Sequence, residues 1–111
     1  MLARKIAAFA KEACEDKKGS DITVLDLRKL NAIASYFVIS SGNSDRHVRA
    51  IAENVLATLS EKRVDTRHVE GKTDARWILL DYGDVIVHVF YHETRKFYNL
   101  ERLWGNAKRL S

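Results

Sequence analysis

The segment ARWILLDYGDVIVHVFY, from Ala75 to Tyr91, constrains the fold more than any other part of the 111-residue sequence. It is apolar at nearly every position except for the polar stretch Asp81–Asp84 in its middle. Two runs rich in β-branched and aromatic residues, separated by a short stretch that contains glycine, predict a β-hairpin. Because large apolar groups occupy consecutive positions, both faces of this hairpin must be covered, either by other parts of the chain or by a partner.

A two-residue turn at Tyr82–Gly83 defines a register for the hairpin that pairs Leu80 with Val85 and Trp77 with His88. Paired residues share a face of the sheet, and the faces alternate along each strand. The first face is then aliphatic and comprises Arg76, Ile78, Leu80, Val85, Val87 and Val89. The second face comprises Trp77, Leu79, Ile86, His88 and Phe90, and ends in Asp81 and Asp84.

The two faces of the hairpin differ in chemistry. The aliphatic face has the composition of a core packed under helices. The second face mixes a large aromatic ring, aliphatic groups, an ionisable ring and acids, as in protein interfaces, where Trp anchors are enriched and polar groups border them. The other interpretation is that a further helix covers this face, and periodicity alone does not separate the two.

Apolar spacing predicts the remaining elements. Helices are expected from Leu2 to about Asp16, ending at Lys17-Lys18-Gly19, and from Asp45 to about Lys62, with Ser44 as N-cap. Strands are expected at Asp21–Leu27, at Tyr36–Ser41 and, more weakly, at Asp65–Gly71, and Leu30–Ser35 is compatible with one turn of helix. A last helix is expected after the hairpin, with one apolar stripe that ends at Gly105 and is formed by Phe97, Leu100, Leu103 and Trp104.

The predicted order is α-β-β-α-β-β-β-α, with no internal repeat and no linker. It favours the α/β class: one domain over residues 1–111, built on a mixed sheet of about five strands with helices packed on it.

Composition limits the function classes. The chain is 46% hydrophobic and 31% charged and has no apolar run of bilayer length, which predicts a globular cytoplasmic protein without membrane contact. Cys14 is the one cysteine, so it forms no internal disulfide and is expected to be a small buried hydrophobe. The net charge of +4 is spread along the chain, so direct RNA contact stays open, with Arg46, Arg49, Lys62 and Arg63 as its candidates.

Candidate catalytic and metal sites are incomplete. The Ser40–Ser44 turn joins a strand to a helix N-terminus, which can hold phosphate on free amides, but no Gly-Lys-Ser/Thr follows it. A nucleotidyltransferase needs two neighbouring carboxylates for Mg²⁺, whereas Asp81 and Asp84 flank a turn and Asp26 stands alone. No dense ligand motif is formed by the four histidines, His47, His68, His88 and His92. The residues therefore predict no cofactor, no metal and no enzyme, with a residual nucleotide-binding or nucleotidyl-transfer enzyme at the Ser40–Ser44 turn as the alternative.

Three ordered segments resemble the ribosomal silencing factor family, also called the Iojap family. They are ASYFVISSGNSDRHVRAIAENV, VEGKTDARWILLDYGDVIVHVF and RKFYNLERLWGNA, and the likeness runs collinearly from about Asp21 to Ala107. The resemblance implies an α/β fold related to the nucleotidyltransferases but without their activity. It also implies a translational repressor that binds the large ribosomal subunit through ribosomal protein L-fourteen and sterically blocks association of the two subunits.

The resemblance further implies where the partner binds. Trp77 and Leu79 are expected to form an apolar anchor, and Asp81, Asp84 and His88 a polar edge. Phe90 joins this face from the second strand. Tyr98 and Leu100 extend the surface or pack the last helix on the sheet, and Trp104 is expected to pack. A homodimer is also implied, without an indication of the surface that pairs.

Overall fold

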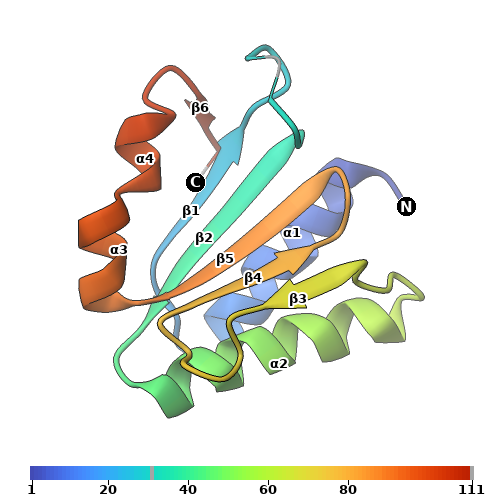
Figure 1. The fold of residues 1–111 in the computed structure, drawn as a ribbon. Coiled ribbons are helices and arrows are strands. Elements are labelled where there is room, and N and C mark those ends of the chain that lie inside the picture. Colours follow the sequence, from blue (N-terminus) through green and yellow to red (C-terminus); the bar gives the residue numbers. More distant parts are fainter. Residues whose placement is uncertain (31, 111) are drawn as a thin grey trace.

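The computed structural model describes residues 1–30 and 32–110. The chain forms a six-stranded sheet in the order β3-β4-β5-β2-β1-β6 (Figure 1). In chain order the elements are α1 (Ala3–Asp16), β1 (Ser20–Asp26), β2 (Tyr36–Gly42), α2 (Asp45–Glu61), β3 (His68–Glu70), β4 (Trp77–Asp81), β5 (Val85–Tyr91), α3 (His92–Tyr98), α4 (Leu100–Leu103) and β6 (Lys108–Arg109). Strands β2 and β5 run parallel, while the other pairs in the described sheet are antiparallel. The predicted α/β class and mixed sheet are confirmed, with β6 as an additional edge strand.

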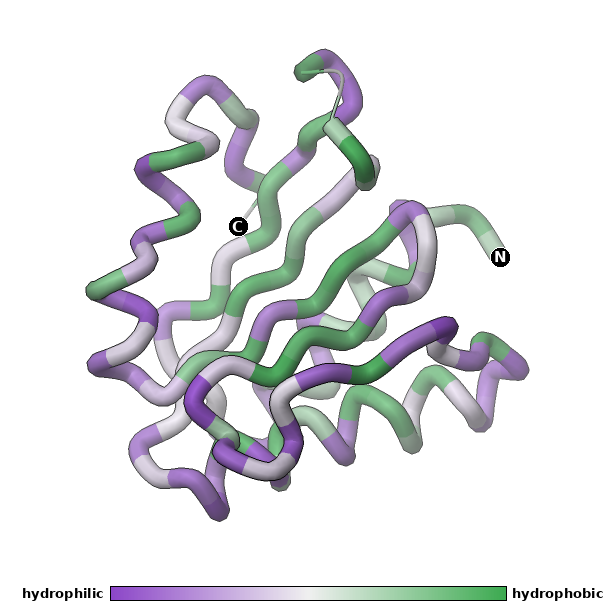
Figure 2. The backbone as a smooth tube through the Cα atoms, in the orientation of Figure 1, coloured by the Kyte–Doolittle hydropathy of each residue, from purple (hydrophilic) through white to green (hydrophobic). Residues whose placement is uncertain are grey.

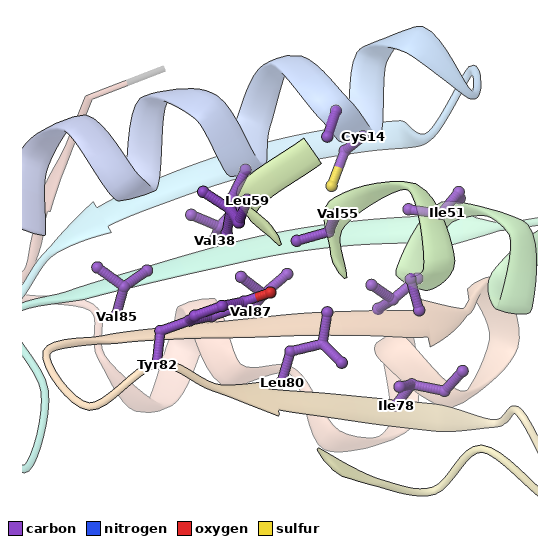
Figure 3. Close-up of a cluster of buried hydrophobic side chains, with 14 of the residues drawn as sticks. Cys14, Val38, Ile51, Val55, Leu59, Ile78, Leu80, Tyr82, Val85 and Val87 are labelled. Atoms are coloured by element: carbon purple, nitrogen blue, oxygen red, sulfur yellow. The ribbon is translucent and has the colours of Figure 1, made fainter. Parts of the chain in front are cut away.

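Helices α1 and α2 cover one face of the sheet. As predicted, Ser44 is the N-cap of α2, and its side-chain oxygen accepts a hydrogen bond from the His47 N–H at 3.1 Å. Figure 3 shows aliphatic side chains of the strands meeting those of the two helices, with Cys14 among them. Burial raises the pKa of the Cys14 thiol to about 12, as expected for a cysteine that serves as a core hydrophobe.

The hairpin forms with the predicted faces but in a different register. Trp77 pairs with Phe90 and Leu79 with His88, so each residue pairs two positions further along than predicted. The Tyr82 N–H donates to the Val85 carbonyl at 2.9 Å, which makes Gly83 and Asp84 the turn residues. Moving the turn by one residue shifts every partner by two, and because side chains alternate with period two, the faces are unchanged.

Burial of Tyr82 explains the position of the turn. Its ring lies in the core under α1 and α2, on the same face as Leu80 (Figure 3). Gly83 then takes the first turn position with a φ of +85°, which only glycine adopts readily. The Asp81 carboxylate accepts from the Gly83 N–H at 2.7 Å and so closes the turn.

The opposite face is covered only in part, by α3, α4 and the segment between β1 and β2. The last helix was predicted to be continuous, which is wrong: Asn99 has a φ of +45° and separates α3 from α4. Leu100 and Trp104 pack on the sheet, whereas Phe97 and Leu103 are exposed. The single apolar stripe is therefore split between the core and the surface.

The helical turn that Leu30–Ser35 allowed includes Asn31, which lies outside the described residues, and residues 32–35 form no helix. Figure 2 shows that the central strands are the most continuously hydrophobic part of the chain. In the described part of the chain, no helix is long and apolar enough to cross a membrane.

Candidate functional site

Trp77 is the centre of an aromatic cluster on the partly covered face of the sheet. Its side chain is half-buried at the start of β4, and its indole N–H donates to Nδ1 of His88 at 3.1 Å. The indole stacks on Phe90 with ring centroids 4.9 Å apart and contacts Tyr98 of α3 at 4.8 Å. A hydrogen bond, a stacked ring and a neighbouring helix thus hold the indole in one orientation while part of it faces solvent.

His88 supports Trp77 from beneath. Its side chain is 4% exposed, and burial lowers the pKa of the imidazole to about 4, so the ring is neutral near pH 7. Since Nδ1 accepts the indole N–H, the ring proton is on Nε2, which has no hydrogen-bond partner in the described residues. The placement of His88 on the polar edge of the surface is therefore wrong, because its ring lies inside, edge-on to Phe37 at 4.6 Å.

The other predicted residues divide into surface and support. Leu79 and Asp81 are half-buried on the same face as Trp77, and Asp84 is exposed at the turn. Phe90 is fully buried under the indole, so it reaches a partner only through Trp77. The structure brings Trp77, Leu79 and Asp81 together along one strand and sets Asp84 apart beyond its end.

The two predicted residues of the last segment also differ. Tyr98 is 50% exposed and adjoins Trp77, so it belongs to the surface. Leu100 is buried on the same face of the sheet as Phe37 and Phe90, and Trp104 packs there edge-on to Phe37 with ring centroids 5.9 Å apart. The predicted packing role of Trp104 is confirmed.

Sequence reasoning missed two surface residues, Phe97 and Leu103. Their side chains are 83% and 72% exposed, and together with Tyr98 and Arg102 they line a shallow hollow on α3 and α4. Asn99 could have indicated this exposure, because asparagine is among the few residues that commonly adopt positive φ and end helices, and the break at Asn99 divides the apolar stripe. We refer to Trp77, Leu79, Tyr98, Phe97 and Leu103 as the Trp77 surface.

The remaining candidates lie elsewhere. Arg49 donates to the carbonyl of Lys72 at 2.9 Å, and Lys62 lies over the ring of Phe9 at 4.1 Å, so two of the proposed RNA-contacting residues have internal partners.

His68 pairs with Glu70 at 3.0 Å on β3. In the ranges 1–30 and 32–110, no group of three or more His, Cys, Asp or Glu side chains could hold a metal ion. The nucleotidyl-transfer alternative stays a prediction.

Comparisons with known proteins agree on one family. Residues 2–111 match the model of a family described as "Ribosomal silencing factor during starvation". The chain is 44% identical over 104 residues to ribosomal silencing factor RsfS of Bacillus subtilis, covering 94% of this chain and 88% of that protein. It is 37% identical over 97 residues to the chloroplastic protein Iojap of Zea mays, covering 86% of this chain and 42% of the maize protein.

Solved structures share the fold. A crystal structure of a protein from Chromobacterium violaceum superposes with a TM-score of 0.91 at 41% identity, covering 95% of this chain and 88% of that one. A crystal structure from Bacillus halodurans superposes with a TM-score of 0.85 at 35% identity, covering 97% and 98% of the two chains. Both identities are high enough for the likeness to extend beyond the fold to the sequence.

Proposed function

Because this chain belongs to the ribosomal silencing factor family, whose members are ribosome-associated regulators of translation, we propose that it binds the large ribosomal subunit through ribosomal protein L-fourteen. The bound protein sterically blocks association of the two subunits and so represses translation. Occlusion of this kind needs a durable interface and no catalytic step.

The observation that carries the proposal is the state of Trp77, which is partly exposed and held in place before any partner arrives. Trp side chains in well-packed settings are enriched among the residues that dominate binding energy. The hydrogen bond to His88 and the stacking on Phe90 remove the rotational freedom of the indole, so less entropy is lost on binding.

The surroundings of Trp77 fit a protein partner. Tyr98 contacts the indole, and Phe97 and Leu103 are further exposed apolar residues that line one hollow with Tyr98. Contiguous exposed apolar patches mark interaction sites. In the proposed interface Trp77 and Leu79 form the apolar anchor, and Asp81 and Asp84 form the polar edge. His88, Phe90 and Leu100 act from beneath as the support of this surface.

Cosedimentation of the Trp77→Ala variant with large ribosomal subunits tests the proposal. Truncating a desolvated aromatic anchor costs about 2 kcal/mol or more, so we expect affinity to fall roughly thirtyfold. Leu2→Ala is the control, because Leu2 is also an exposed apolar residue but precedes α1 on the other side of the sheet. Unchanged binding by a folded Trp77→Ala protein would remove Trp77 from the anchor role.

A further inference from the structure

A polar pocket of about 710 Å³ lies at one end of the sheet, apart from Trp77 and Leu79. It is bounded by the ends of β1 and β2, by α3 and by the chain after α4. Its lining includes Thr23, Ser41, Asn43, Arg95, Lys96 and Arg109. None of these residues has a role in the proposed ribosome contact.

The topology of the sheet accounts for the position of the pocket. Strands β2 and β5 are neighbours and parallel, so their carboxyl ends, Gly42 and Tyr91, meet at the same edge. From there the chain after β2 enters α2 on one face of the sheet, while the chain after β5 enters α3 on the opposite face (Figure 1). Adjacent parallel strands whose connections diverge in this way leave a crevice, which is where open α/β sheets bind ligands.

Cationic side chains converge on this crevice. Arg95 is only 7% exposed and donates to the Ser41 hydroxyl at 2.9 Å and to the Thr23 hydroxyl at 3.2 Å. Arg109 donates to the same Thr23 hydroxyl at 3.1 Å, so two guanidinium groups meet at one oxygen. Two like charges brought this close indicate that a negative charge between them would be favourable.

The acidic groups of the lining are too few to balance these cations. Arg95, Lys96 and Arg109 carry three positive charges, against two negative charges on Asp21 and Glu101. Glu101 is already engaged by Arg95 at 2.9 Å. Among the described ion pairs, neither Lys96 nor Arg109 has a carboxylate partner. Both residues are exposed, and Arg109 also donates to the Thr23 hydroxyl.

We propose that this pocket binds a small molecule that carries a phosphate or pyrophosphate group. Guanidinium and ammonium groups recognise phosphate oxygens through charge-assisted hydrogen bonds, and the amide of the exposed Asn43 adds a neutral partner. The volume lies in the range of small-molecule sites, which favours a discrete ligand of nucleotide size. Arg95 holds the floor of the pocket, while Lys96 and Arg109 supply the charges that the ligand meets.

Isothermal titration calorimetry of the full chain tests the proposal, with inorganic pyrophosphate and adenosine diphosphate as probes at constant ionic strength. We expect saturable one-to-one binding of at least one probe. The double variant Lys96→Gln/Arg109→Gln should weaken it by roughly tenfold or more, since hydrogen bonds to charged groups are among the strong ones. Arg95 is left unchanged because its loss would detach α3 from the sheet.

The control is Lys5→Gln/Lys29→Gln, which removes the same charge from two exposed sites outside the pocket. Equal weakening in both double variants would show a diffuse charge effect and overturn the proposal, as would the absence of saturable binding of either probe by the unmodified chain. A single-stranded RNA oligonucleotide is the third probe, and binding of RNA alone through Lys96 and Arg109 would also overturn it. No arm contains ribosomes, so the outcome is independent of the Trp77→Ala result.

Discussion

At the scale of single residues, the buried His88 orients the indole of Trp77, a role that its position in the sequence does not indicate. A neutral imidazole beneath Trp77 accepts the indole hydrogen bond, and protonation at Nδ1 would remove that acceptor. The low pKa keeps the ring in the accepting form across the pH range in which most proteins operate. The surface that we assign to the ribosomal partner therefore rests on a titratable group held in its neutral state.

This pKa predicts a loss of stability in acid. The unfolded chain takes up the His88 proton near pH 6.5, whereas the folded chain resists it down to about pH 4, so the unfolded state binds more protons between these values. The free energy of unfolding should therefore fall as pH drops from 6.5 toward 4, by about 3 kcal/mol at most. Urea unfolding at a series of pH values measures the slope.

The control for this prediction is His88→Gln, which keeps a hydrogen-bond acceptor near Trp77 but does not titrate. The difference in slope between the two proteins isolates His88, because every other titratable group is present in both. The carboxyl of Asp26, whose pKa is lowered to about 2 chiefly by its hydrogen bond to Arg28, contributes its own loss below pH 3.8 and so outside this window. Identical slopes for the two proteins between pH 6.5 and 4 would contradict the prediction.

At the scale of elements, the entry into β4 depends on Gly71. Its φ is +88°, and a Cβ atom there would collide with the backbone oxygen of Trp77. Gly71→Ala should destabilise the protein by about 2 kcal/mol, because it combines backbone strain with a clash against backbone that cannot rotate away. Thermal unfolding measures the loss, and Gly105→Ala, where the nearest atom is 3.3 Å away rather than in collision and φ is not positive, should cost less stability than Gly71→Ala.

Gly71→Ala should also affect the Trp77 surface, because Gly71 contacts the Trp77 backbone. Displacement of the Trp77 backbone moves the indole relative to His88, so Gly71→Ala should also weaken cosedimentation with large subunits at temperatures where the protein remains folded. If Gly71→Ala melts at the same temperature as the unmodified chain, the proposed contact between Gly71 and β4 does not constrain the strand.

Helices α3 and α4 yield a second element-scale prediction. Phe97 and Leu103 are mostly exposed, so Phe97→Ser/Leu103→Ser should leave the melting temperature nearly unchanged. If these residues belong to the interface, the same variant should weaken binding to large subunits by about tenfold, the usual scale for a pair of apolar contacts outside the central anchor. Ile33→Ser, at another exposed apolar position, is the matched control. Binding that equals the control would limit the interface to β4 and Tyr98.

The hairpin shows which features of this fold the sequence could predict. Face assignment depends only on whether a position is odd or even, so it tolerated a turn placed one residue too early. Register depends on which two residues form the turn. Tyr82 lies between polar residues in the sequence, so nothing there indicates that its ring is buried and that the turn begins at Gly83. The contact between Trp77 and His88 was expected from direct pairing, yet the structure forms it diagonally, across the Trp77–Phe90 and Leu79–His88 pairs.

At the scale of the whole molecule, the two faces of the sheet are covered unequally, and the covering helix that periodicity left open exists for only part of the second face. Helices α1 and α2 bury the aliphatic face, while Leu100 and Trp104 cover the other face near β2 and leave Trp77 and Leu79 half-buried on β4. Periodicity could not reveal this, because the break at Asn99 determines how far the last segment reaches. Covering by the last segment therefore accounts for one part of the second face, and the other part remains available to the proposed partner.

This unequal covering also predicts how two copies of the chain would meet. Three of the exposed large hydrophobic residues, Phe97, Tyr98 and Leu103, line one hollow on α3 and α4, and Tyr98 contacts Trp77. A symmetric dimer uses the same patch on both subunits, so the homodimer implied by the family resemblance is expected to form through the Trp77 surface. Dimerisation and ribosome binding then exclude each other. Sedimentation velocity over a range of concentrations should show self-association of the unmodified chain and its loss in Trp77→Ala. A Trp77→Ala protein that dimerises normally but fails to bind large subunits would place the dimer contact on another face.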